Sequence, residues 1–497
     1  MSEVISIPRA ISDIATVRPD DPALIIDGEP FCWSQFDELS SIAAAALIDA
    51  KVEFGDLIAV ASRNDVDFFI SVLACYKTGS IPMPISSRLT APERSEIFSV
   101  AKPRVIVGFN GFEGVSHSIR RLDGSWAKSA ITNSFISRVR NELDVVSPSW
   151  KAPTSGGSTG RPKVIIATDC AAIDRSGTAG MLMRKSGRVC IPGPMYHNGP
   201  FSYAVRALAF GNTIVTSSQR FTSESTLRMA ERSQAYWMLL VPTMMHRILR
   251  DPARFEYSLE SLEFLWHVGA KCPEWVKVEW IRWLGPKRIC ELYAGTEAQA
   301  ITSIRGDEWL KHRGSVGRVT VGEMSVRGED NELLPTGVVG EIYMRPTPGR
   351  LTYRYIGAVP KAIDGGWESL GDLGYFDADG YLYISDRLTD MIVTGGANVY
   401  PAEVESAIEE LPGVTAAVVV GIPDDEFGSV VAAVVQVDHG SGVTEQHLAE
   451  SIAMRLARYK IPRRWRLTTT NLRDDAGKVR RSMWKGAFVE GDAQEVD

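Results

Sequence analysis

The stretch best equipped for chemistry is Thr154-Ser-Gly-Gly-Ser-Thr-Gly-Arg-Pro-Lys163, which combines glycines, hydroxyl residues and a lysine. Its glycines leave backbone N–H groups free to curl around an anion, and Lys163 adds a positive charge. The loop therefore suits the phosphates of a nucleotide. It is not a Walker A loop, because Pro162 precedes the lysine and residues 164–166 favour a strand where that motif needs a helix. The residues assigned to phosphate binding are Thr154, Ser155, Gly156, Gly157, Ser158, Thr159, Gly160 and Lys163.

The same loop also matches the pattern G-x-S-x-G, the nucleophile elbow of serine hydrolases, with Ser158 in the nucleophile position. That elbow lies between a buried strand and a helix. Residues 148–153 do not read as a buried strand, and a strand is expected after the loop. A serine hydrolase that uses Ser158 is kept as a remote alternative, and a flexible Gly/Ser loop without a ligand is another.

Six shorter motifs follow the loop along the chain. They are Pro194-Met-Tyr-His197-Asn198, Glu291-Leu-Tyr293-Ala-Gly-Thr296-Glu297, Gly371-Asp372-Leu-Gly374, Asp386-Arg387, Gly395-Gly396 and Gly477-Lys478. In this order, the loop and these motifs resemble the acyl-adenylate-forming superfamily, which includes acyl- and aryl-CoA ligases, firefly luciferase and peptide-synthetase adenylation domains. The resemblance spans about residues 150 to 480, and Gly79-Ser-Ile-Pro82-Met-Pro84 is compatible with it.

The resemblance implies an ATP-dependent carboxylate–CoA ligase that works in two half-reactions. A carboxylic acid and ATP give acyl-AMP and pyrophosphate, and the thiol of coenzyme A then displaces AMP. Transfer of the acyl group to the phosphopantetheine of a carrier protein is the alternative within the superfamily. ATP, Mg²⁺ and CoA are thus the expected cofactors and co-substrates.

The resemblance also assigns the nucleotide contacts. Tyr293 would stack its ring on adenine, and Thr296 would bond a phosphate oxygen. Asp372 would accept hydrogen bonds from the ribose hydroxyls, which is a common use of an acidic side chain. Arg387 would support the ribose or the phosphate. Glu297 and Thr159 would meet Mg²⁺, since this hard cation prefers oxygen ligands.

Lys478, Glu297 and His197 are the expected catalytic residues. When an acid attacks the α-phosphorus of ATP, two anions approach one another. A cation about 4 Å from the reacting oxygens contributes on the order of 4 kcal/mol at an effective dielectric constant near 20. By resemblance, Lys478 supplies that cation, and His197 lines the entrance between the acyl pocket and the thiol tunnel.

The expected acyl pocket is rich in small residues and shows no basic or acidic residue placed to meet a polar substrate head. Such an apolar pocket favours a bulky hydrophobic acid, either steroid-like, terpenoid or aromatic. Residues 193–201 also resemble ligases for bile-acid or steroid side-chain acids. The pocket residues are Tyr196, His197, Asn198, Phe201, Met244, His267, Gly269, Ala270, Ala294 and Gly295.

Strand-like and helix-like segments alternate in the part of the chain that must position these groups. Residues 56–60 read as a strand, residues 67–78 as a helix and residues 104–108 as the next strand. This order predicts an α/β fold of mainly parallel β-sheets covered by helices, with an additional β-rich portion.

A change in the sequence pattern near residue 387 predicts a second, small α+β domain, and the resemblance implies that this domain is mobile. Residues 1–387 would form the N-terminal adenylating domain with the acyl pocket and the ATP site. Residues 388–497 would carry Lys478 and, at Gly395 and Gly396, part of the CoA tunnel. Its expected elements are a helix with Val404, Ala407, Ile408 and Leu411 on one face, strands at 416–420 and 430–437, and a helix from Leu448 to Tyr459.

Several positions depart from the family pattern. The hinge position, usually Asp or Lys, is Thr389, and the usual threonine before Gly-Asp is Leu370. The lysine loop has Leu472 and Asp474 where Pro and Thr are common. We expect both half-reactions nevertheless, with Asp474 and Asp475 competing for the Lys478 amine.

Composition excludes several other classes of protein. The 497 residues include 54 basic and 61 acidic side chains, and this net charge of −7 argues against nucleic-acid binding. No apolar run is long enough to span a membrane, and the start does not read as a secretory signal. The six cysteines are scattered, which favours a reducing cytoplasm. The expected partners are a small carboxylic acid, ATP and CoA, and a homodimer is left open.

Overall fold

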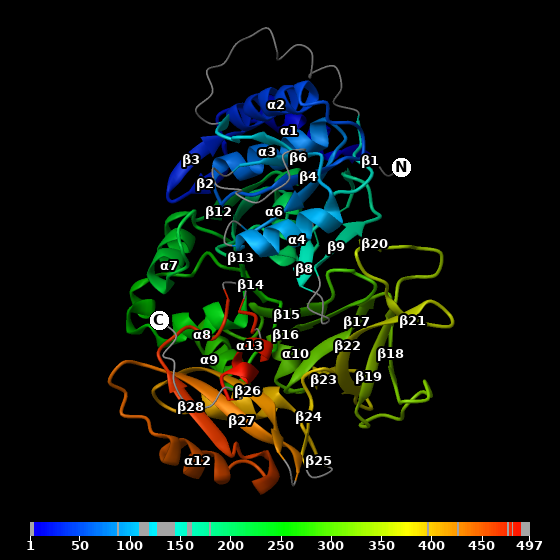
Figure 1. The fold of residues 1–497 in the computed structure, drawn as a ribbon. Helices are drawn as coiled ribbons and strands as arrows, with labels where there is room; N and C mark the ends of the chain where they lie inside the picture. The colour runs from blue at the N-terminus through cyan, green and yellow to red at the C-terminus, as the bar shows by residue number, and fades with distance from the viewer. Residues whose placement is uncertain are drawn as a thin grey trace.

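The computed structural model describes residues 4–86, 89–108, 119–126, 145–156, 162–177, 180–394, 397–424, 427–474, 477–479 and 481–488. In Figure 1 the blue N-terminal helices lie at one end of the molecule, the green and yellow sheet lies in the middle, and the orange C-terminal strands lie at the other end.

A four-stranded parallel sheet follows the first helices, in the order β5-β4-β6-β7. The expected strands at 56–60 and 104–108 are β4 and β6, and the expected helix is α3; β5 and α4, which lie between α3 and β6, were not predicted. Asp65 caps α3 by accepting the Phe68 N–H at 2.9 Å, which fixes where the helix begins. The bounds are β4 (Leu57–Val60), α3 (Val66–Lys77), β5 (Ile81–Pro84), α4 (Ala91–Ala101), β6 (Val105–Val107) and β7 (Arg120–Leu122).

The large sheet contains 14 strands and changes character along its width. Its first half is parallel except for β3, which pairs antiparallel with β2. All four residues of β13 are buried, as expected for a parallel strand covered on both faces. The bounds are β2 (Pro22–Ile26), β3 (Glu29–Cys32), β11 (Gly187–Cys190), β12 (Asn212–Thr216), β13 (Trp237–Leu240), β14 (Phe264–His267) and β15 (Ile289–Ala294).

From β15 onward the strands of this sheet pair antiparallel, which is the β-rich portion expected from the sequence. The change from parallel to antiparallel pairing occurs at the strand whose end carries Tyr293. Ligands of open α/β sheets bind at such carboxyl ends of strands. The bounds are β16 (Ile301–Arg305), β17 (Ser315–Val321), β18 (Glu323–Arg327), β19 (Gly340–Arg345), β21 (Lys361–Ile363), β22 (Trp367–Phe376) and β23 (Leu382–Arg387).

Helices pack on the parallel half, and a small antiparallel sheet, in the order β20-β9-β8, flanks it. Two buried apolar clusters hold this part together, one around Trp33 and Trp237 and the other around Trp280. The bounds are α1 (Ile7–Val17), α2 (Trp33–Asp49), α6 (Asn198–Ala209), α7 (Ser223–Arg232), α8 (Pro242–Arg250), α9 (Glu274–Leu284), α10 (Gly306–Trp309), β8 (Thr154–Gly156), β9 (Pro162–Ala167) and β20 (Tyr353–Ile356), with β1 (Val4–Ser6) paired to β10 (Ala172–Asp174).

The C-terminal part builds two apolar clusters whose members all come from residue 392 onward. Its long hairpin of β26 and β27 is alanine- and valine-rich and buried on both faces. The bounds are β24 (Ile392–Thr394), β25 (Ala397–Val399), α11 (Pro401–Glu409), β26 (Val414–Asp424), β27 (Gly428–Val437), α12 (Glu445–Ala453), β28 (Arg464–Thr468) and α13 (Arg481–Gly486).

The helix expected to run from Leu448 to Tyr459 is shorter, because α12 ends at Ala453. The carbonyl oxygen of Ile452 accepts the N–H groups of both residues 455 and 456, which closes the helix. The chain is extended at Ala457 and forms a short 3-10 turn, Arg458–Lys460, in which Lys460 pairs with Glu403 at 2.7 Å. This pairing with α11 explains why the apolar spacing does not continue as one helix. Among the described helices, none combines the length and apolar character needed to cross a bilayer.

Candidate active site

One large cleft opens at the carboxyl ends of the parallel strands and extends to the C-terminal part. Its volume is about 2970 Å³, against about 300–1,000 Å³ for a typical small-molecule site. It therefore has room for more than one substrate. Candidate residues that line it are Thr154, Lys163, Tyr196, His197, Asn198, Gly269, Ala270, Tyr293, Ala294, Gly295, Thr296, Glu297, Asp372, Arg387, Thr389 and Lys478.

Tyr293, Asp372 and Arg387 form one hydrogen-bonded cluster in this cleft. The Tyr293 hydroxyl donates to Asp372 Oδ2 at 2.7 Å, and Arg387 Nε donates to Asp372 Oδ1 at 3.2 Å. The register of β22 and β23 places Asp372 directly opposite Arg387. Burial, followed by the charge of Asp372, raises the pKa of Tyr293, so its ring stays neutral. The neutral ring of Tyr293 could stack on a nucleotide base, and the neighbouring carboxylate of Asp372 could accept hydrogen bonds from the ribose.

Lys163 and Glu297 form a second cluster together with Tyr355, which the sequence did not single out. Lys163 Nζ donates to Glu297 Oε1 at 3.1 Å and to the Tyr355 hydroxyl at 2.9 Å. The Tyr355 hydroxyl donates to the same carboxylate oxygen at 2.5 Å. Pairing of β9 with β20 sets Tyr355 opposite Ile165, two positions from Lys163. Because only strand pairing brings Tyr355 here, no local signal could have identified it.

The carboxylate of Glu297 is suited to Mg²⁺, because Mg²⁺ sites commonly use one or two carboxylates together with substrate phosphates. Glu297 is only 4% exposed and faces the cleft. Within the described ranges, the cluster able to hold a metal by protein groups alone is His312, Asp377 and Asp379, and it does not include Glu297. A cation at Glu297 would therefore depend on the nucleotide.

Lys478 reaches the cleft from a turn that Asp474 holds through the backbone. Asp474 Oδ1 accepts the Lys478 N–H at 2.8 Å, and the Asp474 N–H donates to the Lys478 carbonyl at 2.9 Å. No ion pair of the Lys478 amine is formed with any described residue. Asp474 thus caps the turn and also attracts the Lys478 amine electrostatically, so its competition for the amine stays a prediction. Asp475, the other expected competitor, lies outside the described residues. The walls of the cleft, and then Arg387, lower the pKa of Lys478, against the attraction of Asp474 and Glu297.

Gly477 allows the lysine turn to approach the N-terminus of α8. Its φ is +74°, and a Cβ there would lie 2.5 Å from Thr243 Oγ1. Two further contacts hold the C-terminal part on α8. Arg247 donates to Asn471 Oδ1 at 2.8 Å, and Arg250 donates to the Val414 carbonyl at 3.4 Å. These contacts keep Lys478 facing the cleft.

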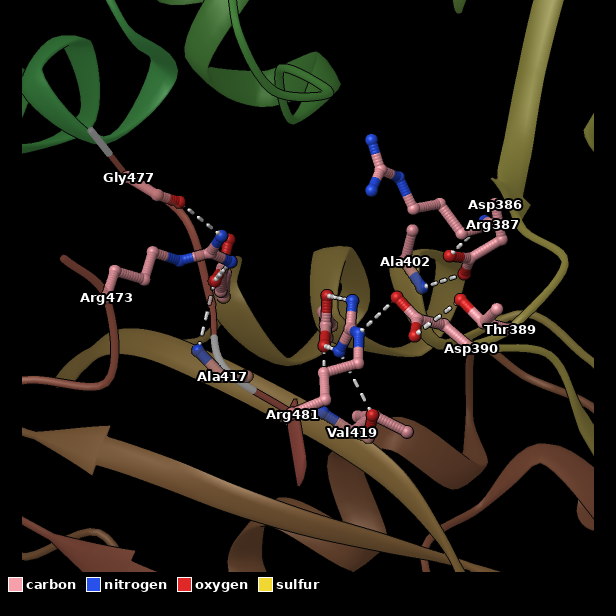
Figure 2. A network of polar contacts seen from close by, with 12 residues as sticks. Asp386, Arg387, Thr389, Asp390, Ala402, Ala417, Val419, Arg473, Gly477 and Arg481 are labelled. Atoms are coloured by element: carbon pink, nitrogen blue, oxygen red, sulfur yellow. Dashed lines mark hydrogen bonds and ion pairs between the residues drawn. The ribbon is translucent and has the colours of Figure 1, made fainter. Parts of the chain in front are cut away.

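Two arginines clamp the ends of the lysine turn, as Figure 2 shows. Arg473 donates to Glu409 Oε1 at 2.7 Å and to the Gly477 carbonyl at 3.3 Å. Arg481 pairs with Glu405 and donates to Asp390 Oδ2 at 3.0 Å. Burial would lower the pKa of Arg481, but the attraction of Glu405 outweighs it and raises that pKa. Neither arginine was predicted, because their partners lie on α11, on β26 and in the segment before β24.

The expected hinge lies beside this clamp. Thr389 lines the cleft, and its hydroxyl donates to Asp390 Oδ1 at 3.4 Å. Asp386 bridges the end of β23 and the first turn of α11, because its Oδ2 accepts the Ala402 N–H at 2.8 Å (Figure 2). The Asp386 carboxylate thus joins the end of β23 to α11 across the expected hinge.

His197 caps the start of α6, and its Nε2 is buried without a hydrogen-bond partner. Burial, and then the charge of Lys478, lowers the pKa of His197 to about 3. The imidazole is therefore neutral at physiological pH, and its unpaired nitrogen is available to a ligand.

Three expected pocket residues do not line the cleft. Phe201 lies on the face of α6 that packs against Phe68, and Met244 is buried in the apolar cluster around Trp280. His267 is fully buried, 3.8 Å from Glu291. Its neighbours in β14 face the cleft instead, because side chains alternate along a strand.

Two of the departures from the family pattern, Leu370 and Leu472, pack as apolar groups. A Cβ at Gly295 would lie 2.3 Å from Leu370, so Leu370 fills the space beside that glycine. Leu472 is 3% exposed and belongs to the apolar cluster with β26. Both side chains contribute to packing at positions where the family usually has a threonine or a proline.

Part of the expected site lies outside the described residues. These positions are Gly157, Ser158, Thr159, Gly160, Gly395 and Gly396. Ser155 and Gly156 belong to β8, which pairs antiparallel with β9. Since a strand, not a helix, follows the loop, the geometry of a serine-hydrolase elbow is absent from the described flanks.

The wall of the cleft also carries two basic residues that contradict the expectation of a pocket without charge. Lys151 and Arg206 both line it, together with Trp150. Lys151 precedes the phosphate loop by three positions, and Arg206 lies two turns into α6. Sequence reasoning missed both because neither belongs to a motif.

Comparison with known proteins identifies the class. Residues 11–350 match the AMP-binding enzyme family, and residues 403–477 match the C-terminal domain of AMP-binding enzymes. The first match covers more than half of the chain, so the chain belongs to the AMP-binding enzyme family. The family resemblance and the expectation of an enzyme are therefore confirmed.

Named relatives cover nearly the whole chain. Long-chain-fatty-acid–CoA ligase FadD13 of Mycobacterium tuberculosis is 29% identical over 92% of this chain and 93% of its own length. Fatty acid–acyl-carrier-protein ligase ScoC of Streptomyces coeruleorubidus is 27% identical over 97% and 96%. The o-succinylbenzoate CoA synthetase MenE of Bacillus subtilis, solved with the acyl-adenylate OSB-AMP, has the same fold, with a TM-score of 0.82 and 23% identity over 100% of both chains.

Proposed function

We propose that the chain is an ATP-dependent carboxylate–CoA ligase. A carboxylate oxygen of the acid attacks the α-phosphorus of ATP, which forms acyl-AMP and releases pyrophosphate. The thiol of CoA then attacks the acyl carbon, the bond to the phosphate oxygen breaks, and AMP leaves. The observation that carries this proposal is that Lys478 lines the same cleft as Glu297 and Asp372.

Each cluster of the cleft has a part in this reaction. Tyr293 and Asp372 would hold adenine and ribose, with Arg387 orienting the carboxylate of Asp372. Lys163 would neutralise phosphate charge, and Glu297 would hold Mg²⁺, which supplies further charge neutralisation. In B. subtilis MenE, ATP and a magnesium ion are bound in one solved structure. Lys478 would offset the repulsion between the attacking carboxylate and the triphosphate.

We further propose that residues 388–497 move as a unit about Thr389. In the described arrangement Lys478 faces the cleft, which suits adenylation. Rotation about the hinge would withdraw Lys478 and bring Gly395 and Gly396 to a thiol tunnel. Separate apolar clusters on the C-terminal side of the hinge support this division, since a part with its own core can move as one body.

Pyrophosphate release on addition of ATP, Mg²⁺ and a carboxylic acid is the direct test. Lys478→Ala should reduce acyl-AMP formation about a thousandfold, because the Coulomb term at about 4 Å is on the order of 4 kcal/mol. It should spare thioester formation from supplied acyl-AMP. Lys311→Ala, at an exposed position outside the cleft, is the matched control. Equal loss of both half-reactions in the Lys478 variant would contradict the role of its amine.

Two kinds of thiol could accept the acyl group in the second half-reaction. Relatives of similar identity are named for CoA and for an acyl-carrier protein as acceptor. We favour free CoA, and a phosphopantetheinyl carrier protein is the second candidate. Thioester formation measured with CoA and with a loaded carrier protein distinguishes them, and absence of product with CoA alone would favour the carrier.

We also propose a bulky, largely hydrophobic acid. Apolar and aromatic side chains cover much of the cleft beside His197, namely Met181, Leu182, Tyr203, Val241, Trp266 and Val268. Such a lining disfavours a short acid, because a short chain leaves apolar surface exposed to water. Equal turnover of acetate and of polycyclic acids would contradict this proposal.

A further inference from the structure

Lys151 faces the cleft on the same side as the phosphate loop. The hydrogen bonds from Ile165 to Pro153 and from Ala167 to Lys151 continue the register of β8 and β9 beyond their strand ends. Lys151 is therefore opposite Ala167, as Ser155 is opposite Lys163. Four residues of extended chain separate Lys151 from Ser155, which amounts to about 13 Å. The backbone of Lys151 therefore lies on the wall of the cleft about that far from the phosphate loop.

The Lys151 amine is buried without a carboxylate partner among the described residues. The residue is only 5% exposed. Its Nζ donates to Asn198 Oδ1 at 2.5 Å and to Ser202 Oγ at 3.4 Å, and both acceptors are neutral. No ion pair joins it to an Asp or Glu of the described chain. A buried charge is costly unless it is paired. Here burial, and then Arg206, lowers the pKa of Lys151 to about 7, against the more distant Glu297 and Asp169.

The helix facing Lys151 presents a polar stripe to the cleft. Asn198, Ser202 and Arg206 are spaced four residues apart on α6, so they share one face. The indole of Trp150 lies between the two cations, with the Lys151 amine 4.7 Å and the Arg206 guanidinium 5.9 Å from its ring centre. Beside them the wall is apolar, with Met181 and Leu182. Polar groups therefore gather at one place in an otherwise hydrophobic pocket.

A purely structural role explains this arrangement poorly. Fastening α6 to the hairpin needs a hydrogen-bond donor, and a neutral side chain would supply one without burying a charge. The ammonium group has three N–H donors, and Asn198 and Ser202 accept two of them, so a substrate oxygen could accept the third.

Building on the proposed ligase activity, we propose that Lys151 binds a second oxygen acceptor of the substrate, at the end remote from the reacting carboxylate. The acid then has a hydrophobic body and a far carbonyl or carboxylate oxygen. The amine donates to this oxygen, Arg206 attracts it electrostatically, and Asn198 and Ser202 hold the amine in place. No covalent step is involved.

Three acids with one skeleton test the proposal. They are cyclohexylpropanoic acid and its analogues that carry a keto oxygen or a carboxyl group on the ring carbon opposite the chain. Pyrophosphate release gives kcat/KM for each acid, and the ratio of a substituted acid to the unsubstituted one is the readout. The wild type should prefer a substituted acid. Lys151→Met should reduce that ratio about tenfold or more, because one charge-assisted hydrogen bond is lost.

A second variant keeps the test valid if Lys151→Met does not fold. Ser202→Asp would give the amine a carboxylate partner and should reduce the same ratio, most strongly for the carboxyl analogue because of charge repulsion. Lys311→Met is the matched control and should keep the wild-type ratio. The analogue whose ratio falls further in Lys151→Met identifies the oxygen as carbonyl or carboxylate.

The outcomes separate this proposal from the ligase activity. An unchanged ratio in both variants, or a wild type that prefers the unsubstituted acid, overturns the role of Lys151 and leaves the ligase activity standing. If the wild type releases no pyrophosphate with these or other acids, the ligase proposal fails and this inference fails with it.

Discussion

Replacing Arg481 by methionine should loosen the turn that carries Lys478. Arg481 lies at the first position of α13, and its guanidinium contacts Glu405, Asp390 and the Val419 carbonyl (Figure 2). Glu405 is only 5% exposed and also accepts the Val419 N–H at 2.8 Å. The methionine retains much of the arginine's apolar contact and removes the charge. Glu405 would then be a buried carboxylate without its main partner.

The size of the effect follows from this burial. Breaking a buried ion pair on one side costs about 3–5 kcal/mol, against about 5–15 kcal/mol for the stability of a whole domain. The equilibrium for opening the C-terminal part should therefore shift about a hundredfold to a few thousandfold toward the open state. Adding Glu405→Gln to Arg481→Met removes the unpaired carboxylate. The double variant should therefore recover a large part of the lost stability.

Hydrogen exchange of the full chain, followed by mass spectrometry, measures this opening locally. Peptides from β26 and α11 should exchange faster in Arg481→Met, and peptides from α2 should not change. Acyl-AMP formation should fall while thioester formation from supplied acyl-AMP falls less, because only the first step uses Lys478. If Arg481→Met lowered the free energy of opening by less than about 1 kcal/mol, the size of an exposed ion pair, the reasoning would be refuted. A double variant no more stable than Arg481→Met would refute it as well.

Three further results are expected. Asp372→Asn should weaken AMP binding measured by calorimetry about tenfold or more, since a charged acceptor is lost, and unchanged affinity would rule out its ribose role. Gly477→Ala should slow adenylation about tenfold, because φ is +74° and the Cβ would lie 2.5 Å from Thr243 Oγ1, and Thr243→Ala should restore part of the rate. Burial raises the pKa of Glu405, but Arg481 outweighs it and the net pKa lies below the ordinary 4.5. The folded chain thus binds fewer protons than the unfolded chain near that pH, so denaturant unfolding should lose stability more steeply on acidification in the wild type than in the double variant.

Much of the nucleotide side of the site could be read from the sequence. Its residues sit in short motifs, and the motifs follow each other in the family's order. Asp372 and Arg387 are an example, because each belongs to one of these motifs, and the structure places them opposite each other on β22 and β23. Short runs of apolar, mostly β-branched residues also predicted β4, β6, β26 and β27, because such residues fit a buried sheet.

Burial of particular faces was less predictable. Phe201 and Met244 lie within or beside motif segments, yet each is on the side of its helix that packs into a core. The sequence spacing tells which residues share a face, and it does not tell which neighbour covers that face. The early end of α12 has a similar cause, since Lys460 turns away to meet Glu403.

The amino-acid sequence by itself determined the family, the order of the α/β elements and the residues able to meet phosphate, ribose and Mg²⁺, because these depend on residue type and local spacing. Only the tertiary structure decided which charged and polar side chains are in contact. Tyr355 reaches Glu297 through strand pairing, Arg481 reaches Glu405 across the C-terminal part, and Lys151 meets α6 on the wall of the cleft. Such contacts join residues dozens of positions apart, and their energies depend on burial, which local spacing does not encode.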